Sequence, residues 1–117
     1  MKKIIDTKEI ISKEIDVDFN FYENDKYIGI SIQKKSNIYN VVKILKHNSA
    51  LLFNQLIDIT AIDYTSRELR FDVIYLLMSL KLNLRILIKT SIGENDMIES
   101  ISSIHKSANW YERECYD

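Results

Sequence analysis

The sequence predicts an α+β domain of two layers, in which a mostly antiparallel sheet is covered by helices on one face. Several short segments alternate apolar and polar residues with the period of two that is typical of strands. Another segment repeats apolar residues at the helical spacing of three and four. The chain has 117 residues, of which 46% are hydrophobic, with no proline and only two glycines. Since no linker divides it, we expect a single domain over residues 1–117.

The N-terminal part predicts a helix followed by a β-hairpin. The helix is expected over residues 7–14, with Thr7 as its cap and isoleucines along one side. Residues 17–22 and 28–33 then alternate apolar and polar side chains on either side of a polar turn. This arrangement is typical of two antiparallel strands.

Two helices are expected in the middle of the chain. Asn37 can cap the first, which carries the most regular apolar stripe in the sequence, formed by Ile38, Val41, Val42 and Leu45. The second is expected to begin at Ser49 and to turn Leu52, Phe53 and Leu56 toward the core.

Three strands and a terminal helix are expected in the second half. Ile57, Ile59 and Ala61 indicate a strand, and residues 69–78 form another that is apolar on both faces in its second half. Such a strand is expected to be central in the sheet and buried on both sides. Residues 84–89 alternate again and follow a short connection, so they are its hairpin partner.

The final residues, 107–117, combine aromatic and charged side chains. At helical spacing Arg113 lies one turn beyond Trp110 and one turn before Asp117, so its guanidinium can stack on the indole and meet the carboxylate. We expect a partner interface with Arg113 as its electrostatic centre, because aromatic residues and arginine anchor interfaces. Its predicted residues are Trp110, Glu112, Arg113, Glu114, Tyr116 and Asp117. The alternative is a salt-bridge cluster within the domain.

Composition argues against several classes of partner. A net charge of -1 with interspersed acids and bases offers no basic field for nucleic acid and no polybasic patch for a membrane. No apolar stretch reaches the roughly 18 to 20 residues of a spanning helix. We therefore expect membrane association only through partners.

No catalytic or cofactor constellation is apparent. Glu112 and Glu114 point to nearly opposite sides of a helix, so they are poorly placed to act as an acid–base pair. Cys115 and His105 lack the spacing of metal ligands. Asp58 and Asp63 have no third carboxylate nearby, and strand-end or partner contacts are the simpler role for them. We expect no catalytic residue, metal or cofactor in this chain.

Four blocks of residues follow one another from Phe53 to Asp117. The first comprises Phe53, Leu56, Asp58, Ile59, Thr60, Ile62, Asp63 and Tyr64, and the second Arg70, Phe71, Val73, Ile74, Tyr75, Leu77, Met78 and Ser79. The third comprises Asn83, Arg85, Ile86, Ile88 and Lys89, and the fourth Ala108, Trp110, Glu112, Arg113, Glu114, Tyr116 and Asp117. In order and spacing they resemble the thirty-kilodalton subunit, also called the C subunit, of NADH:quinone oxidoreductase, respiratory complex I.

This resemblance implies a structural subunit without a redox centre in the peripheral arm of the complex. Flavin and iron–sulfur clusters are then expected in partner subunits. The implied partners are other complex I subunits, especially the forty-nine-kilodalton quinone-site subunit. The implied location is the matrix side of the mitochondrial inner membrane, or alternatively the cytoplasmic face of a bacterial membrane.

The sequence departs from the family pattern at three places. Glu99 replaces a proline, His105 replaces an aromatic residue, and the family's C-terminal tail beyond Asp117 is lacking. We expect a separately encoded fragment to complete the subunit, because acidic groups at the C-terminus of a helix are stabilised by nearby positive charges. Two other hypotheses are a free-standing interaction module that uses the Trp/Arg cluster, and a small hydrolase with Asp58, Asp63 or Glu114 in a pocket.

Overall fold

The computed structural model describes residues 2–22 and 27–116 of the chain. The elements in order are α1 (Lys2–Glu14), β1 (Phe19–Tyr22), β2 (Ile28–Ile32), the short 3-10 helix η1 (Lys35–Asn37), α2 (Ile38–His47), β3 (Gln55–Asp63), β4 (Phe71–Ser79), β5 (Leu84–Ile92) and α3 (Ala108–Tyr116). The described segments thus contain the strands and the terminal helix that the sequence predicts.

The strands form one sheet in the order β1-β2-β5-β4-β3. All neighbours are antiparallel except β2 and β5, which run parallel with Ile28 opposite Ile86. This parallel pair is possible because η1, α2, β3 and β4 lie between the two strands in the sequence. Strand β4 lies between β5 and β3, as the prediction of a central strand requires.

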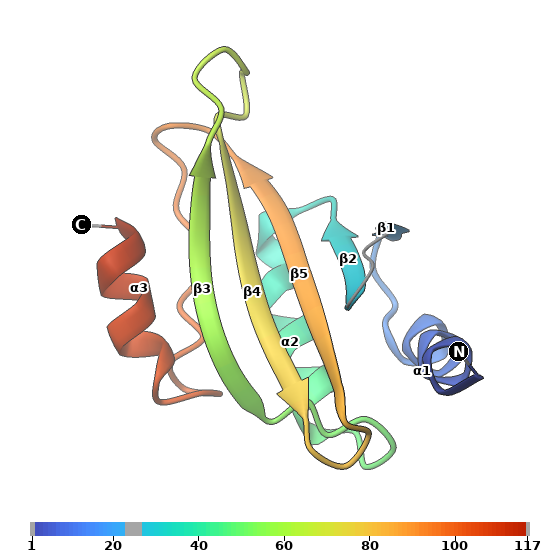
Figure 1. Ribbon diagram of the computed structural model, residues 1–117. Coiled ribbons are helices and arrows are strands. Elements are labelled where there is room, and N and C mark those ends of the chain that lie inside the picture. The colour runs from blue at the N-terminus through green and yellow to red at the C-terminus, as the bar shows by residue number, and fades with distance from the viewer. Residues whose placement is uncertain (1, 23–26, 117) are drawn as a thin grey trace.

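The helices leave one face of the sheet open. Figure 1 shows α2 crossing behind the sheet, with α1 beyond the β1 edge and α3 beside β3. The apolar stripe of α2 is fully buried, and it packs with the inward side chains of β2, β5 and β4 into one core. The predicted α+β class, with a mostly antiparallel sheet covered by helices on one face, is confirmed.

The open face corrects one expectation about β4. Tyr75 and Leu77 point into the core, whereas Ile74, Leu76 and Met78 on the opposite face are only half-buried. The strand is therefore central in its hydrogen bonding but is buried on one side only.

The predicted helix from Ser49 is wrong. The side chain of Asn48 accepts the N–H of Ala50, and the N–H groups of Leu51 and Leu52 return to the carbonyl of Asn48. Leu52 then adopts a positive φ of 50°, which ends the turn. Because a helix cannot continue through this left-handed conformation, the chain enters β3 at Gln55 instead.

Two predicted caps are also corrected. Helix α1 begins at Lys2 rather than near Thr7, and the Thr7 hydroxyl donates to the carbonyl of Lys3 from inside the helix. Asn37 does precede α2, but its side chain makes no capping hydrogen bond because η1 leads directly into the helix.

Candidate functional site

Helix α3 is held against the sheet by the loop that leads into it. Ile101 and Ile104 of this loop and Ala108 of the helix are buried in the common core. Main-chain bonds from Ile104 and His105 to the carbonyl of Ile101, both 2.9 Å long, form the turn that brings the chain to the helix. The helix therefore starts from an anchored base, next to β3 (Figure 1).

Glu112 fastens the helix to the same loop. Its side chain is 8% exposed and accepts the hydroxyl of Ser100 at 2.8 Å and the N–H of Ile101 at 3.3 Å. No salt bridge in the described part of the chain involves this carboxylate. Glu112 thus holds the helix to the loop through neutral donors, and the alternative of a salt-bridge cluster that includes Glu114 and Asp117 stays a prediction.

Trp110 and Arg113 lie on the outside of α3. Trp110 is 63% exposed, and Arg113 is exposed as well. Among the described side chains no cation–π contact joins the two, so the predicted stacking is not found. A large indole ring in solvent remains a surface to which a partner can bind.

The remaining predicted interface residues fall at the end of the helix. The backbone of α3 extends through Tyr116. The side chains of Glu114 and Tyr116, that of Cys115, and all of Asp117 lie outside the described residues. The proposed contact between Arg113 and Asp117 therefore stays a prediction.

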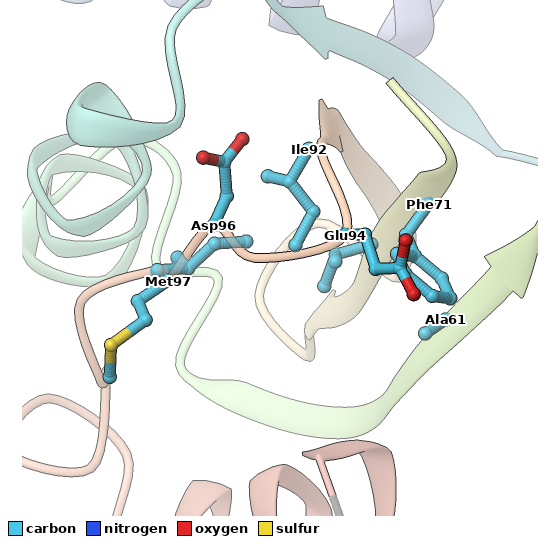
Figure 2. A pocket seen from close by; sticks show the side chains of 8 residues that line it. Ala61, Phe71, Ile92, Glu94, Asp96 and Met97 are labelled. Atoms are coloured by element: carbon cyan, nitrogen blue, oxygen red, sulfur yellow. The ribbon is translucent and has the colours of Figure 1, made fainter. Parts of the chain in front are cut away.

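A hollow of about 350 Å³ opens where β3, β4 and the loop after β5 meet. Figure 2 shows Phe71 and Ile92 at its wall and the carboxylates of Glu94 and Asp96 at its rim. Its remaining lining residues are Ala61, Val73, Met97 and Ile98. Neither Asp58 nor Asp63 lines it, so the hollow does not assemble the carboxylates of the hydrolase hypothesis.

Ion pairs connect this rim to the β3–β4 hairpin. The guanidinium of Arg70 meets Asp63 through two bonds of 2.7 and 2.9 Å and reaches Glu94 at 3.3 Å. The hydrogen bond from Arg70 lowers the pKa of Asp63 from its usual value. Asp96 accepts the N–H of Gly93 at 2.7 Å and pairs with Lys35 at 3.5 Å. These acids thus have structural partners.

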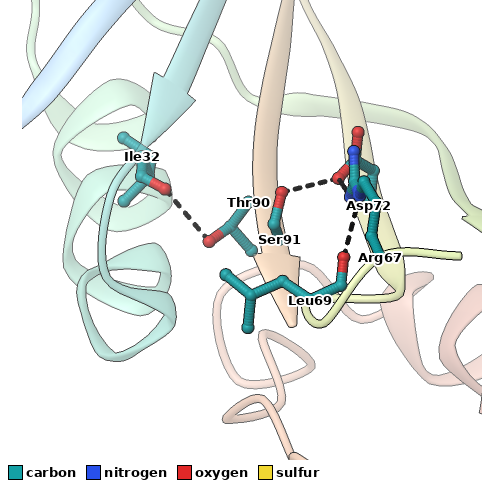
Figure 3. Close-up of polar contacts among 6 residues, drawn as sticks. All are labelled: Ile32, Arg67, Leu69, Asp72, Thr90 and Ser91. Atoms are coloured by element: carbon teal, nitrogen blue, oxygen red, sulfur yellow. Dashed lines mark hydrogen bonds and ion pairs between the residues drawn. The ribbon is translucent and has the colours of Figure 1, made fainter. Parts of the chain in front are cut away.

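A second polar cluster lies near the same end of the sheet (Figure 3). Asp72 is 5% exposed and accepts hydrogen bonds of 2.6 Å from both Arg67 and Ser91. Burial alone would raise the pKa of Asp72, but these two hydrogen bonds, together with the positive charges of Arg67 and Lys89, outweigh burial and lower it. Nearby, Thr90 donates to the carbonyl of Ile32 at 3.1 Å and joins β5 to the end of β2.

Asp58 takes the simpler role that the sequence favours. Its carboxylate accepts the N–H of Ile59 at 2.9 Å and the hydroxyl of Thr60 at 3.0 Å, next to a register shift in β3. Within residues 2–22 and 27–116 no cluster of three or more His, Cys, Asp and Glu residues is placed to hold a metal ion.

His105 is a feature that sequence reasoning missed. It is 5% exposed, and its Nε2 has no hydrogen-bond partner within the described structure. Burial, together with the nearby charges of Lys46 and His47, lowers its pKa to about 4. Lys46 itself donates to the carbonyl of Ile104. A histidine in an aromatic position was the signal that could have indicated its burial.

Residues 31–117 match the model of the family described as the respiratory-chain NADH dehydrogenase 30 kDa subunit. The chain belongs to this family. The match runs from the end of β2 through η1, α2, β3, β4 and β5 to α3, so the hollow, the Asp72 cluster and Trp110 all lie on family sequence. The resemblance on the four blocks is therefore confirmed.

Bacterial members of the 30 kDa family are similar over most of this chain. It is 48% identical over 84 residues to the C subunit of NADH-quinone oxidoreductase from Ruegeria sp. (strain TM1040), covering 72% of this chain and 42% of that protein. It is 42% identical over 86 residues to the corresponding subunit from Rhodospirillum rubrum, covering 74% and 40%. The matched part thus spans about two fifths of the length of these relatives.

A solved structure shares the fold of this 30 kDa family member. A chain of the archaeal membrane-bound sulfane sulfur reductase, a respiratory membrane complex, superposes with a TM-score of 0.75 over 97% of this chain and 65% of its own length. The two are 21% identical in sequence, so this likeness concerns the fold. In the described segments no helix combines the length and apolar character that crossing a bilayer requires.

Proposed function

We propose that this chain is a structural subunit of NADH:quinone oxidoreductase that carries no redox centre and supports the subunits of the quinone module. The family match over residues 31–117 is the observation that carries the proposal. The forty-nine-kilodalton subunit is the proposed principal partner. NADH oxidation by flavin and electron transfer through iron–sulfur clusters belong to other chains, as does the binding of quinone.

The exposed outer side of α3 supports a scaffolding role. Glu112 and the buried Ala108 fix the helix from within, and this leaves Trp110 and Arg113 directed outward from a rigid base. An indole ring that is buried away from water in an interface is a common source of binding affinity. We assign the contact to Trp110, Glu112, Arg113, Glu114, Tyr116 and Asp117, with Glu112 as the residue that positions the others.

The proposed location of this chain follows from that of the complex. The complex is held at a membrane by its other subunits, either on the matrix side of the mitochondrial inner membrane or on the cytoplasmic face of a bacterial membrane.

The test is assembly in a cell whose own thirty-kilodalton subunit has been deleted. The wild-type chain is expected to migrate with the NADH-oxidising complex on a native gel and to restore quinone reduction. Trp110→Ala is expected to reduce the assembled fraction severalfold. The matched control is Leu80→Ala, which truncates a side chain of similar exposure, 66%, in the β4–β5 turn. If the wild-type chain stays outside the complex, the proposed function is wrong.

One observation favours a second function, a free-standing interaction module. The indole of Trp110 is exposed in the isolated chain, so a small partner protein could bind to it directly. Recovery of the chain with a single small protein, and not with an NADH-oxidising assembly, would support this reading.

A further inference from the structure

The outer edge of β3 has an open stretch near its C-terminal end. The N–H of Tyr64 donates to the carbonyl of Arg70 at 2.7 Å, directly beyond the last paired residues of β3 and β4. Bonded and non-bonded pairs alternate along an antiparallel ladder. The main-chain groups of Ile62 and Thr60 are therefore turned toward β4, whereas those of Ala61 and Asp63 are turned toward the outer edge.

The N-terminal part of the same edge is closed to another strand. The register of β3 shifts between Leu56 and Asp58, and the carboxylate of Asp58 accepts the outward N–H of Ile59. Bulges and side-chain caps of this kind prevent pairing with another strand. Within the described residues, no main-chain or side-chain bond is made by the outward N–H and C=O groups of Ala61 and Asp63. The open stretch is thus confined to these two positions.

The hollow described above adjoins this open stretch. Ala61 lies at its edge, and its small side chain stands beside the half-buried ring of Phe71 (Figure 2), while Val73 and Ile92 form the buried part of the apolar wall. Residues 60–64 are all exposed. A strand added to β3 would place every second side chain on the face of Ala61, next to the apolar wall.

The charges around the hollow favour a partner segment that carries a positively charged side chain. Asp63, Glu94 and Asp96 are balanced only by Arg70 and Lys35, so these five groups carry a net charge of -1. Arg70 is shared between Asp63 and Glu94, which leaves one carboxylate without a cation of its own. An incoming Lys or Arg would complete the pairing.

We propose that an extended segment of a partner subunit adds to the edge of β3 at residues 61–63. Its main chain bonds to Ala61 and Asp63, one apolar side chain fills the hollow, and a Lys or Arg meets Glu94 or Asp63. The identity of the partner rests on the proposed function, whereas the surface itself rests on the geometry of β3. This contact involves residues other than those assigned to the contact around Trp110.

Ala61→Pro tests the main-chain contact, because proline at this position removes an outward N–H and leaves the bonds to β4 in place. The control is Thr65→Pro. The N–H of Arg67 bonds to the carbonyl of Tyr64, so Thr65 occupies the second position of a turn, where proline fits. Both variants are first compared by thermal unfolding of the isolated chain. In the deletion strain we expect Ala61→Pro to lower the assembled fraction about tenfold and Thr65→Pro to leave it unchanged.

Amide hydrogen exchange of the wild-type chain provides a measurement that needs no variant. The amides of Ala61 and Asp63 are expected to exchange at least about tenfold more slowly in the purified complex than in the isolated chain. The amide of Glu68, in the exposed turn, is expected to keep its rate. If the wild-type chain assembles while both amides exchange as in isolation, strand addition is wrong and the proposed function still stands. If the wild-type chain does not assemble, the proposed function is wrong, and the partner subunit named for this surface is wrong with it.

Discussion

Ser100 donates its hydroxyl to Glu112 at 2.8 Å, and this bond ties the C-terminal helix to the loop before it. Removing the carboxylate also leaves the N–H of Ile101, which lies on a fully buried residue, without a partner. We expect Glu112→Ala to lower the free energy of unfolding by about 1 to 3 kcal/mol. Urea unfolding followed by circular dichroism measures it, with Arg113→Ala, an exposed neighbour, as the control. Equal stability of the two variants would contradict the role of the tie.

His105 is expected to make the fold less stable in weak acid. Its pKa is about 4 in the folded chain, below the usual 6.5, so the unfolded chain binds more protons between these values. Stability is therefore complete above about pH 6.5 and falls by about 1 to 3 kcal/mol as the pH drops to 4. The charges facing this imidazole are those of Lys46 and His47.

The control for His105 is His105→Phe, which keeps a ring of similar size without a titrating group. Urea midpoints between pH 4 and 7 are expected to vary less in this variant than in the wild-type chain. Carboxylates with lowered pKa values, such as Asp72, lose their contribution to stability mainly below about pH 4, outside the range in which His105 titrates. An unchanged pH profile in the variant would assign the loss to another group.

The two arginines of the β3–β4 hairpin are expected to differ in their contribution to stability. Arg67 bonds to the buried Asp72, whereas Arg70 pairs with the exposed Asp63. Arg67→Ala leaves a buried carboxylate with Ser91 as its remaining side-chain donor, and we expect a loss of about 1 to 3 kcal/mol. Arg70→Ala is expected to change little, since exposed ion pairs contribute little. Thermal unfolding of both variants compares them, and a larger loss for Arg70→Ala would reverse this ranking.

Gly29 and Tyr22 form a close contact across the β1–β2 hairpin. A Cβ added at Gly29 would lie 2.7 Å from ring atoms of Tyr22, which is too close for carbon atoms in contact. We expect Gly29→Ala to destabilise the chain by about 1 to 3 kcal/mol through overpacking. The double variant Gly29→Ala/Tyr22→Ala removes the clash, so the two substitutions are expected to be less than additive in urea unfolding. Simple additivity would mean that the ring moves aside at no cost.

Periodicity predicted the sheet well because the inward residues of each strand are apolar in a strict alternation. Ile28, Ile30 and Ile32 are all buried, as are Ile86 and Ile88 opposite them. The same reasoning failed after Ser49, where Leu52 and Phe53 have helical spacing to Leu56. A local turn around Asn48 decided that segment, and a turn of this kind leaves no periodic pattern.

The candidate site was predictable only in part. The exposure of Trp110 follows from its position on the outer side of an amphipathic helix, and the family motif pointed to it. The partner of Glu112 was not predictable, since Ser100 and Ile101 reach it through an irregular loop. The hollow and the open edge of β3 depend on which strand lies outermost, and that order follows from the whole topology.

The parallel pairing of β2 with β5 has a consequence for biosynthesis. Thr90 and Ile32, which it brings together, are 58 positions apart, so the N-terminal hairpin emerges from the ribosome well before its partner strand exists. At about 5 to 20 residues per second the delay is about 3 to 12 seconds. During this interval the isoleucines of β2 have no β5 to pack beside, which makes the nascent chain a natural client for a chaperone.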